Sequence, residues 1–172
     1  MVDPLPLRAH DQAHLEALGG VAWIVVTNSD HIRATAEIRD RWGAKIAGPS
    51  AESATFAMPC DRWLNDGEEV VPGLKALALE GSKTPGELAL LLGEDVLITG
   101  DLVRAHRGGS LMLLPDPKLS DKAGAVDSLR RLAGLPHIEA VLVGDGWCVF
   151  RDGASRLKEC LGLCLAGERD IR

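Results

Sequence analysis

The chain has 172 residues, of which 46% are hydrophobic and 26% are charged, which is enough apolar material for one well-buried domain. Its formal net charge is −6 and it has no run of Lys and Arg, which argues against nucleic acid and anionic membranes as partners. It has no apolar run near the roughly 20 residues that cross a membrane and no signal peptide at its start, so we expect a cytoplasmic protein. Its four cysteines form no C-x-x-C pair, and we expect them to be reduced.

The first part of the chain predicts strands alternating with helices. Val21–Val26 is a continuous apolar run, typical of a strand buried on both faces. The spacing of apolar residues over Ile32–Trp42 predicts a helix, which Gly43 ends. Lys45–Ala47 then predicts a short strand, and Ala51–Phe56 a short helix.

The middle of the chain predicts several consecutive strands. Asn65-Asp66-Gly67 is a turn signal between two short candidate strands. Three further strands are predicted at Leu74–Leu79, Glu87–Leu92 and Val96–Thr99. Arg104–Ser110, which is polar and contains two glycines, is interpreted as a loop, and His106 as a solvated residue within it.

The last part of the chain again predicts helices that alternate with strands. After the apolar segment Leu111–Leu114, a helix is predicted from Ser120 to Ala133, with Ser120 as its N-cap. Glu139–Val143 predicts a buried strand, and Trp147–Phe150 is a further candidate strand. A final helix is indicated by an apolar stripe of Leu157, Cys160, Leu161, Cys164 and Leu165. This order predicts an α/β fold, with helices outside one mixed sheet or two sheets, in a single domain of residues 1–172.

Three of the predicted strands end in an acid, at Asp30, Asp101 and Asp145, and His31 follows the first. Abrupt polar ends of buried strands are where functional sites tend to form. Taken singly, each acid is explained as a turn residue, and Asp30 is also a plausible N-cap of the helix after it. The order of all three is more informative than any one of them.

Together these segments resemble the metallo-β-lactamase superfamily from Val2 to Asp152. The first motif of that family is T-H-x-H-x-D-H. Here Asp30 and His31 match its last two positions, whereas Val26 and Asn28 stand at its first two histidines.

The later motifs of the family follow in order. In Gly81-Ser82-Lys83-Thr84-Pro85-Gly86, which is similar to G-H-T-P-G, Lys83 stands at the histidine. Gly100-Asp101 matches the strand–G-D motif of the bridging aspartate. In Gly144-Asp145-Gly146, Asp145 replaces the last histidine.

The resemblance implies a four-layer αβ/βα sandwich of the metallo-β-lactamase type, lacking the first strands of the family. It also implies that Asp3 orients the loop of Asp30 and His31. Either the native start lies upstream of Met1, or the chain is a minimal version. A missing edge strand would expose unpaired backbone, so we expect a homodimer.

The resemblance implies that, of the family's two metal positions, the first has lost its ligands and the second has kept residues that can bind a metal. The first loses its ligands at Val26, Asn28 and Lys83, none of which replaces a histidine as a ligand. The second retains four residues that can bind a metal, namely Asp30, His31, Asp101 and Asp145. We therefore expect one divalent metal, Zn, Mn or Fe, or no metal at all if Lys83 compensates the acids.

Two functions follow from this expectation. The first is a mononuclear metal-dependent hydrolase of an ester, a thioester or a related small molecule, with Asp30 and Lys83 as candidate catalytic residues and Lys83 stabilising the oxyanion. The second is a catalytically inactive member that binds a ligand or a partner, its acids held by Lys83, Arg33 or His106. The sequence does not indicate the substrate.

Overall fold

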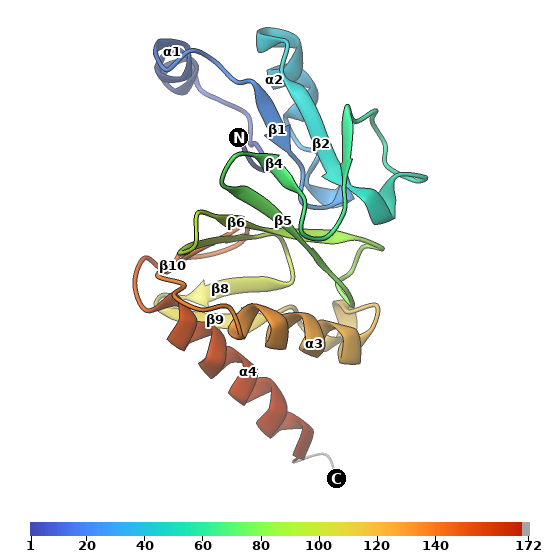
Figure 1. The fold of residues 1–172 in the computed structure, drawn as a ribbon, viewed down its shortest axis with the longest axis vertical. Helices are drawn as coiled ribbons and strands as arrows, with labels where there is room; N and C mark the ends of the chain where they lie inside the picture. The colour runs from blue at the N-terminus through green and yellow to red at the C-terminus, as the bar shows by residue number, and fades with distance from the viewer. Residues whose placement is uncertain (170–172) are drawn as a thin grey trace.

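The computed structural model describes residues 1–169 of the chain, so the last three residues of the predicted domain lie outside the described residues (Figure 1). Its first sheet has three parallel strands in the order β1 (Trp23–Val25), β2 (Lys45–Pro49) and β3 (Arg62–Leu64). Apolar residues of β1 and β2 pack against helix α2 (Thr35–Trp42). This helix ends at Gly43, whose left-handed conformation (φ 67°) is the predicted helix stop.

Helix α1 (Ala9–Ala17), which the sequence analysis did not predict, lies at the same end of the molecule as α2 (Figure 1). It has no buried residue, which explains why it leaves no apolar pattern in the sequence. Before it, Met1–Asp3 runs along the edge of β1, where the Asp3 N–H donates to the Val25 carbonyl at 3.0 Å. The free edge that motivated the homodimer prediction is therefore partly covered.

The second sheet has five strands in the order β10-β7-β6-β5-β4. They are β4 (Glu69–Val71), β5 (Leu74–Leu79), β6 (Glu87–Leu92), β7 (Val96–Thr99) and β10 (Ala140–Val143). Neighbouring strands from β4 to β7 are antiparallel, and β10 is parallel to β7 with Val143 opposite Thr99. Strands β7 and β10 therefore end at the same edge of the sheet.

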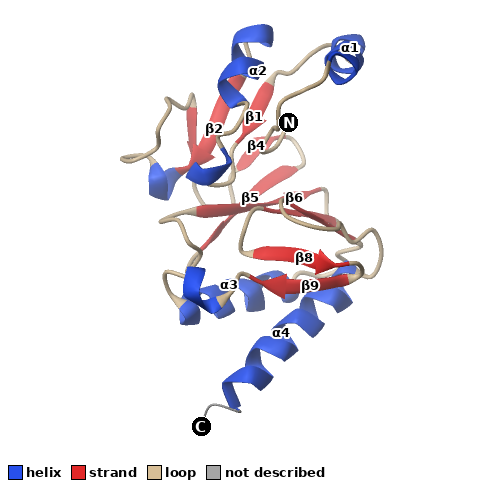
Figure 2. Cartoon of the chain, turned by 180° about the vertical axis from the view of Figure 1, so that it is seen from behind, coloured by secondary structure: helices blue, strands red, loops and turns tan. Residues whose placement is uncertain are grey.

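The outer side of the second sheet is covered by the hairpin β8 (Val103–Arg107) and β9 (Ser110–Leu113) and by helices α3 (Lys122–Ala133) and α4 (Gly153–Arg169) (Figure 2). A separate apolar cluster joins the two sheets: Val25, Ala47, Leu64, Val70, Ala76, Leu88 and Leu90. The layers thus run helix, sheet, sheet, helix, which confirms the predicted sandwich. No helix within residues 1–169 is long and apolar enough to cross a membrane.

Several predicted boundaries in the first part were wrong. Between β1 and α2 the chain forms a 3₁₀ turn, Ser29–His31, so α2 begins at Thr35 and not at Ile32. Asn28 caps this turn by accepting from the Asp30 N–H at 3.0 Å, and Asp30 is not a helix N-cap. The helix predicted at Ala51–Phe56 is a single 3₁₀ turn, Ser50–Glu52.

The later corrections concern one hairpin, one cap and one strand. The predicted loop Arg104–Ser110 is mostly strand β8 and the turn into β9. Helix α3 is capped by Asp121, whereas the Ser120 hydroxyl donates to the Ser82 carbonyl. Trp147–Phe150 is not a strand within the described residues, where Val149 forms an isolated bridge to Val141.

Candidate functional site

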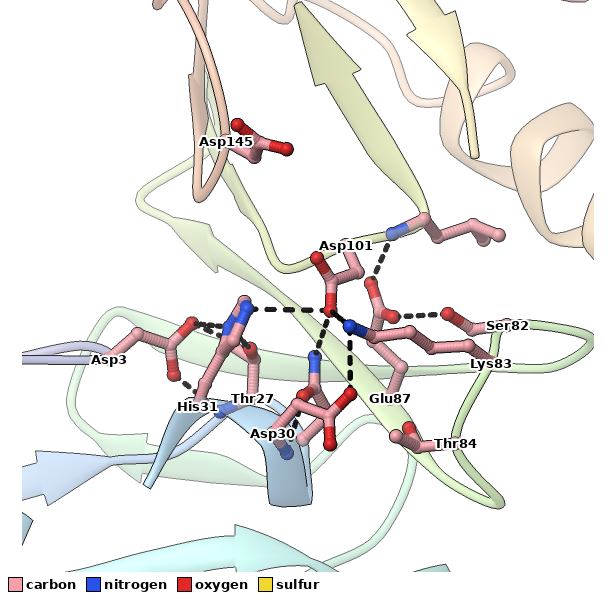
Figure 3. A network of polar contacts seen from close by, with 12 residues as sticks. Asp3, Thr27, Asp30, His31, Ser82, Lys83, Thr84, Glu87, Asp101 and Asp145 are labelled. Carbon is pink, nitrogen blue, oxygen red and sulfur yellow. Dashed lines mark hydrogen bonds and ion pairs between the residues drawn. The ribbon is translucent and has the colours of Figure 1, made fainter. Parts of the chain in front are cut away.

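The predicted site residues lie on loops at one end of the two sheets. Asp30 and His31 follow β1, Asp101 follows β7, and Asp145 follows β10. Lys83 comes from the loop between β5 and β6. Figure 3 shows Asp30, His31, Lys83 and Asp101 converging, with Asp145 farther away.

Asp3 holds the loop that carries His31. Its carboxylate accepts from the Thr27 backbone N–H at 2.7 Å and from the Thr27 hydroxyl at 2.6 Å. The same carboxylate lies 2.8 Å from His31 Nδ1. These contacts agree with the orienting role that the resemblance implied for Asp3.

His31 is a buried imidazole that lies between two carboxylates. Burial opposes its positive charge, but hydrogen bonds to Asp101 and Asp3 outweigh burial and raise the pKa of His31 to about 9. Its Nε2 lies 3.4 Å from Asp101 Oδ2, so each ring nitrogen faces a carboxylate. Near neutral pH the ring therefore acts as a cation with two donors.

Asp101 is the centre of the network, with a side chain that is 5% exposed. Its Oδ2 lies 2.8 Å from Lys83 Nζ, and its Oδ1 lies 3.1 Å from Arg104 Nη2. Asn28 Nδ2 donates to Oδ2 over a longer distance of 3.5 Å. Burial alone would raise the pKa of Asp101, but the hydrogen bonds from His31 and Lys83 hold it well below its usual range.

Lys83 links Asp101 to Asp30. Its Nζ lies 2.7 Å from Asp30 Oδ2, and this second pair is much more open, with Asp30 52% exposed. Burial lowers the pKa of Lys83, but the hydrogen bonds to Asp101 and Asp30 outweigh it and raise the pKa above its usual value. The two residues predicted to be catalytic thus form an ion pair, and their catalytic role stays a prediction.

Arg104 is the site residue that the sequence analysis missed. Its side chain is only 7% exposed, and its Nη1 lies 3.0 Å from Asp145 Oδ2 while Nη2 contacts Asp101. Arg33, which the sequence analysis considered instead, donates to the Asp3 backbone carbonyl at 3.2 Å. Arg104 was missed because its segment was interpreted as a polar loop, in which a buried arginine side chain is not expected.

The sequence analysis interpreted His106 as a solvated residue, but in the structure its side chain also contacts Asp145. Its Nε2 lies 3.0 Å from Asp145 Oδ2, although both side chains remain about half exposed. The hydrogen bond with His106 is the main cause that lowers the pKa of Asp145; burial opposes it, and the nearby Arg104 charge lowers the pKa further. Asp145 is therefore joined to strand β8 through both Arg104 and His106, and through Arg104 it is linked to Asp101.

Glu87, on β6, fixes the loops that present Lys83 and Asp101. Its carboxyl accepts from the Ser82 hydroxyl and from the Leu102 N–H, the latter at 2.7 Å. Its burial raises its pKa to about 7, although both hydrogen bonds lower it. The Gly-Asp turn packs on this group so closely that a Cβ on Gly100 would lie 3.0 Å from Glu87 Oε1.

This donor set does not fit a divalent metal as it stands. Both ring nitrogens of His31 face carboxylates, at 2.8 Å from Asp3 and 3.4 Å from Asp101. Lys83 contacts both Asp30 and Asp101, and Arg104 contacts both Asp101 and Asp145. Within residues 1–169, no group of three or more His, Cys, Asp and Glu side chains is arranged to hold a metal ion.

Comparison with known proteins supports the resemblance. A family model described as "Metallo-beta-lactamase superfamily" matches residues 1–163. No curated protein sequence matches the chain.

Many solved structures match the chain, and three of them are compared with it below. The di-iron-bound form of TTHA1623 is 23% identical with a TM-score of 0.64, over 87% of this chain and 82% of that one. The metallo-beta-lactamase family protein TTHA1429 from Thermus thermophilus is 19% identical with a TM-score of 0.68, over 96% of this chain and 70% of that one. The class B3 di-zinc metallo-beta-lactamase LRA-12 from an Alaskan soil metagenome is 19% identical with a TM-score of 0.64, over 98% of this chain and 82% of that one. At these identities the similarity concerns the fold.

Proposed function

Although this chain belongs to the metallo-β-lactamase superfamily, we propose that it is a non-hydrolytic member that binds a ligand or a partner without a metal. The observation that carries the proposal is the pairing of Asp101, whose buried carboxylate contacts Lys83, Arg104 and His31. Metal ligands need free lone pairs, and here those lone pairs face positively charged side chains.

The charge of the network indicates what it would bind. Four carboxylates, Asp3, Asp30, Asp101 and Asp145, face three cations, His31, Lys83 and Arg104. The most accessible of these groups are the two acids Asp30 and Asp145, at 52% and 47% exposed, whereas the Lys83 side chain is 30% exposed. Asp30, the most exposed of these groups, therefore suits a ligand or a partner segment with a cationic or hydrogen-bond-donating group.

Such a ligand would reach Asp30 by displacing Lys83 from their exposed ion pair. An ion pair this open contributes only about 0–1 kcal/mol, so exchanging Lys83 for another cation at Asp30 costs little. Lys83 would keep its contact with the buried Asp101 during that exchange. The expected ligand group is thus an amine or a guanidinium that pairs with Asp30.

A mononuclear metal-dependent hydrolase is the second candidate. In its favour, the four predicted ligands Asp30, His31, Asp101 and Asp145 do lie at one end of the sheets. Solved structures of the same fold also hold two metals, as the di-iron and di-zinc descriptions state. For this chain, that activity requires the Lys83 and Arg104 contacts to open.

Hydrolysis assays separate the two candidates. Purified protein is incubated with an aryl ester and an acyl thioester, with and without Zn²⁺, Mn²⁺ or Fe²⁺. We expect the rate of the enzyme-free control under every condition. Metal-dependent turnover that disappears in Asp101→Ala would establish the hydrolase instead.

The binding proposal is tested by thermal shift with matched pairs of small amines and carboxylates of the same carbon skeleton. We expect the amines to raise the melting temperature, and Asp30→Asn to remove the effect. A response to the carboxylates alone would contradict an acidic binding surface.

A further inference from the structure

Arg104 occupies an unusual position for an arginine, because it is buried between two carboxylates from different loops. Its Nη2 lies 3.1 Å from Asp101 Oδ1 and its Nη1 lies 3.0 Å from Asp145 Oδ2, with 7% of the side chain exposed. The two acids follow the neighbouring parallel strands β7 and β10, whose pairing brings both loops to one edge of the sheet. The guanidinium therefore forms a bridge that joins the two strand ends.

The surroundings of this bridge are those of a cation site. Asp101 and Asp145 each direct one oxygen at the guanidinium, and His106 Nε2 lies 3.0 Å from the same oxygen of Asp145. Two carboxylates and an imidazole are ligand types that divalent metals accept. Lys83 and His31 contact the other oxygen of Asp101, so they do not compete for this position.

We infer that Arg104 is an internal cation that takes the place of a divalent metal between Asp101 and Asp145, and that its removal converts this position into a metal site. The inference rests on the proposed function, since it explains how the site stays assembled without a metal. Without the guanidinium, Asp101 Oδ1 and Asp145 Oδ2 would lose the cation that they share, and two carboxylates left in this way attract another cation. His106 would complete the ligand set from strand β8.

The test measures Mn²⁺ binding to Arg104→Ala by electron paramagnetic resonance and by equilibrium dialysis. We expect Arg104→Ala to bind one Mn²⁺ at least about tenfold more tightly than the wild type, because a full positive charge has left the site. Mn²⁺ should also raise the melting temperature of this variant and leave that of the wild type unchanged.

Three further variants serve as controls. Arg107→Ala removes an exposed arginine from the same strand and should bind no more Mn²⁺ than the wild type. Arg104→Lys keeps a cation and should not gain the site. Adding Asp145→Asn to Arg104→Ala should abolish the gain, because it removes one of the two bridging carboxylates.

A folded Arg104→Ala that binds Mn²⁺ no better than the wild type would overturn the inference, and so would a gain that survives Asp145→Asn. If Arg104→Ala does not fold without metal, refolding by Mn²⁺ supports the inference. Failure of both Arg104→Ala and Arg104→Gln to refold with Mn²⁺ contradicts it. Binding of one Mn²⁺ per chain by the wild type would contradict the proposed metal-free function itself. Failure of the inference about Arg104 can therefore be distinguished from failure of the proposed function.

Discussion

At the residue scale, the site depends on how the negative charge of the deeply buried Asp101 carboxylate is compensated. A charge as inaccessible as that of Asp101 is stable only with cations or strong donors around it. Three segments of the chain supply them: the turn after β1 gives His31, the loop before β6 gives Lys83, and strand β8 gives Arg104. Since these cations are part of the chain, the compensation needs no ion from solution.

The buried His31 predicts a specific dependence of stability on pH. Its pKa is about 9 in the folded protein and 6.5 in an unfolded chain, so the folded state holds the proton more tightly. The resulting stabilisation is fully present below pH 6.5 and is lost as the pH rises towards 9. We expect the free energy of unfolding to fall over this range by up to about 3 kcal/mol.

Urea unfolding of the wild type and His31→Gln at a series of pH values measures this effect. The variant should be less stable at pH 6 and should show a flatter profile above it. His10→Gln, at an exposed histidine, is the control and should follow the wild type. Parallel profiles for the wild type and His31→Gln would show that His31 does not carry the charge.

Most residues of the site could be predicted from the sequence, because they follow strands in a recognisable order. Asp3, Asp30, His31, Lys83, Asp101 and Asp145 were all found in this way. The sequence suggested Lys83 as a partner of the acids, but it did not indicate the Arg104–Asp145 pair, which joins residues that are far apart in the sequence. Arg104 itself belongs to no motif, and only the structure reveals that it is buried.

At the scale of elements, the strand ends determine where each acid lies. Gly100 is the clearest case, since a Cβ at this position would lie 2.7 Å from Thr27 Oγ1 and 3.0 Å from Glu87 Oε1. A side chain there would push apart the end of β1, the start of β6 and the end of β7. The absence of a side chain at Gly100 thus lets the two sheets meet beneath the site.

We expect Gly100→Ala to destabilise the protein by about 1–3 kcal/mol, because the buried neighbours have little room to move. Gly162→Ala is the matched control, as a Cβ on this glycine of α4 would contact nothing within 4 Å. In a helix interior that change should stabilise by roughly 0.5–1 kcal/mol. Urea unfolding measures both, and a neutral Gly100→Ala would contradict the close packing described.

Elements with a strong apolar pattern were predicted well. Leu74–Leu79, Glu87–Leu92 and Val96–Thr99 match strands β5, β6 and β7 residue for residue. The polar strand β8 was missed, because His106 and Arg107 are exposed and two glycines follow them. Its strand conformation depends on pairing with β9, which is a tertiary contact that no local pattern reports.

At the scale of the whole molecule, the sandwich brings loops from both sheets to one edge. The Leu88 N–H donates to the Thr27 carbonyl at 2.8 Å, which joins the second sheet to the loop of the first at this point. Two solved structures of this fold, those of TTHA1623 and LRA-12, are described as di-iron-bound and di-zinc forms. We propose that in this chain amino-acid cations replace such metals, so the fold and its site should be independent of metal.

Metal content is the most direct test of this claim. The protein is expressed in medium supplemented with zinc, manganese and iron, purified without chelator, and measured by inductively coupled plasma mass spectrometry beside Asp101→Ala. The account predicts a wild type with far less than one metal ion per chain and a melting temperature that EDTA does not change. One bound metal per chain, lost in Asp101→Ala and removed by EDTA with a fall in melting temperature, would contradict it.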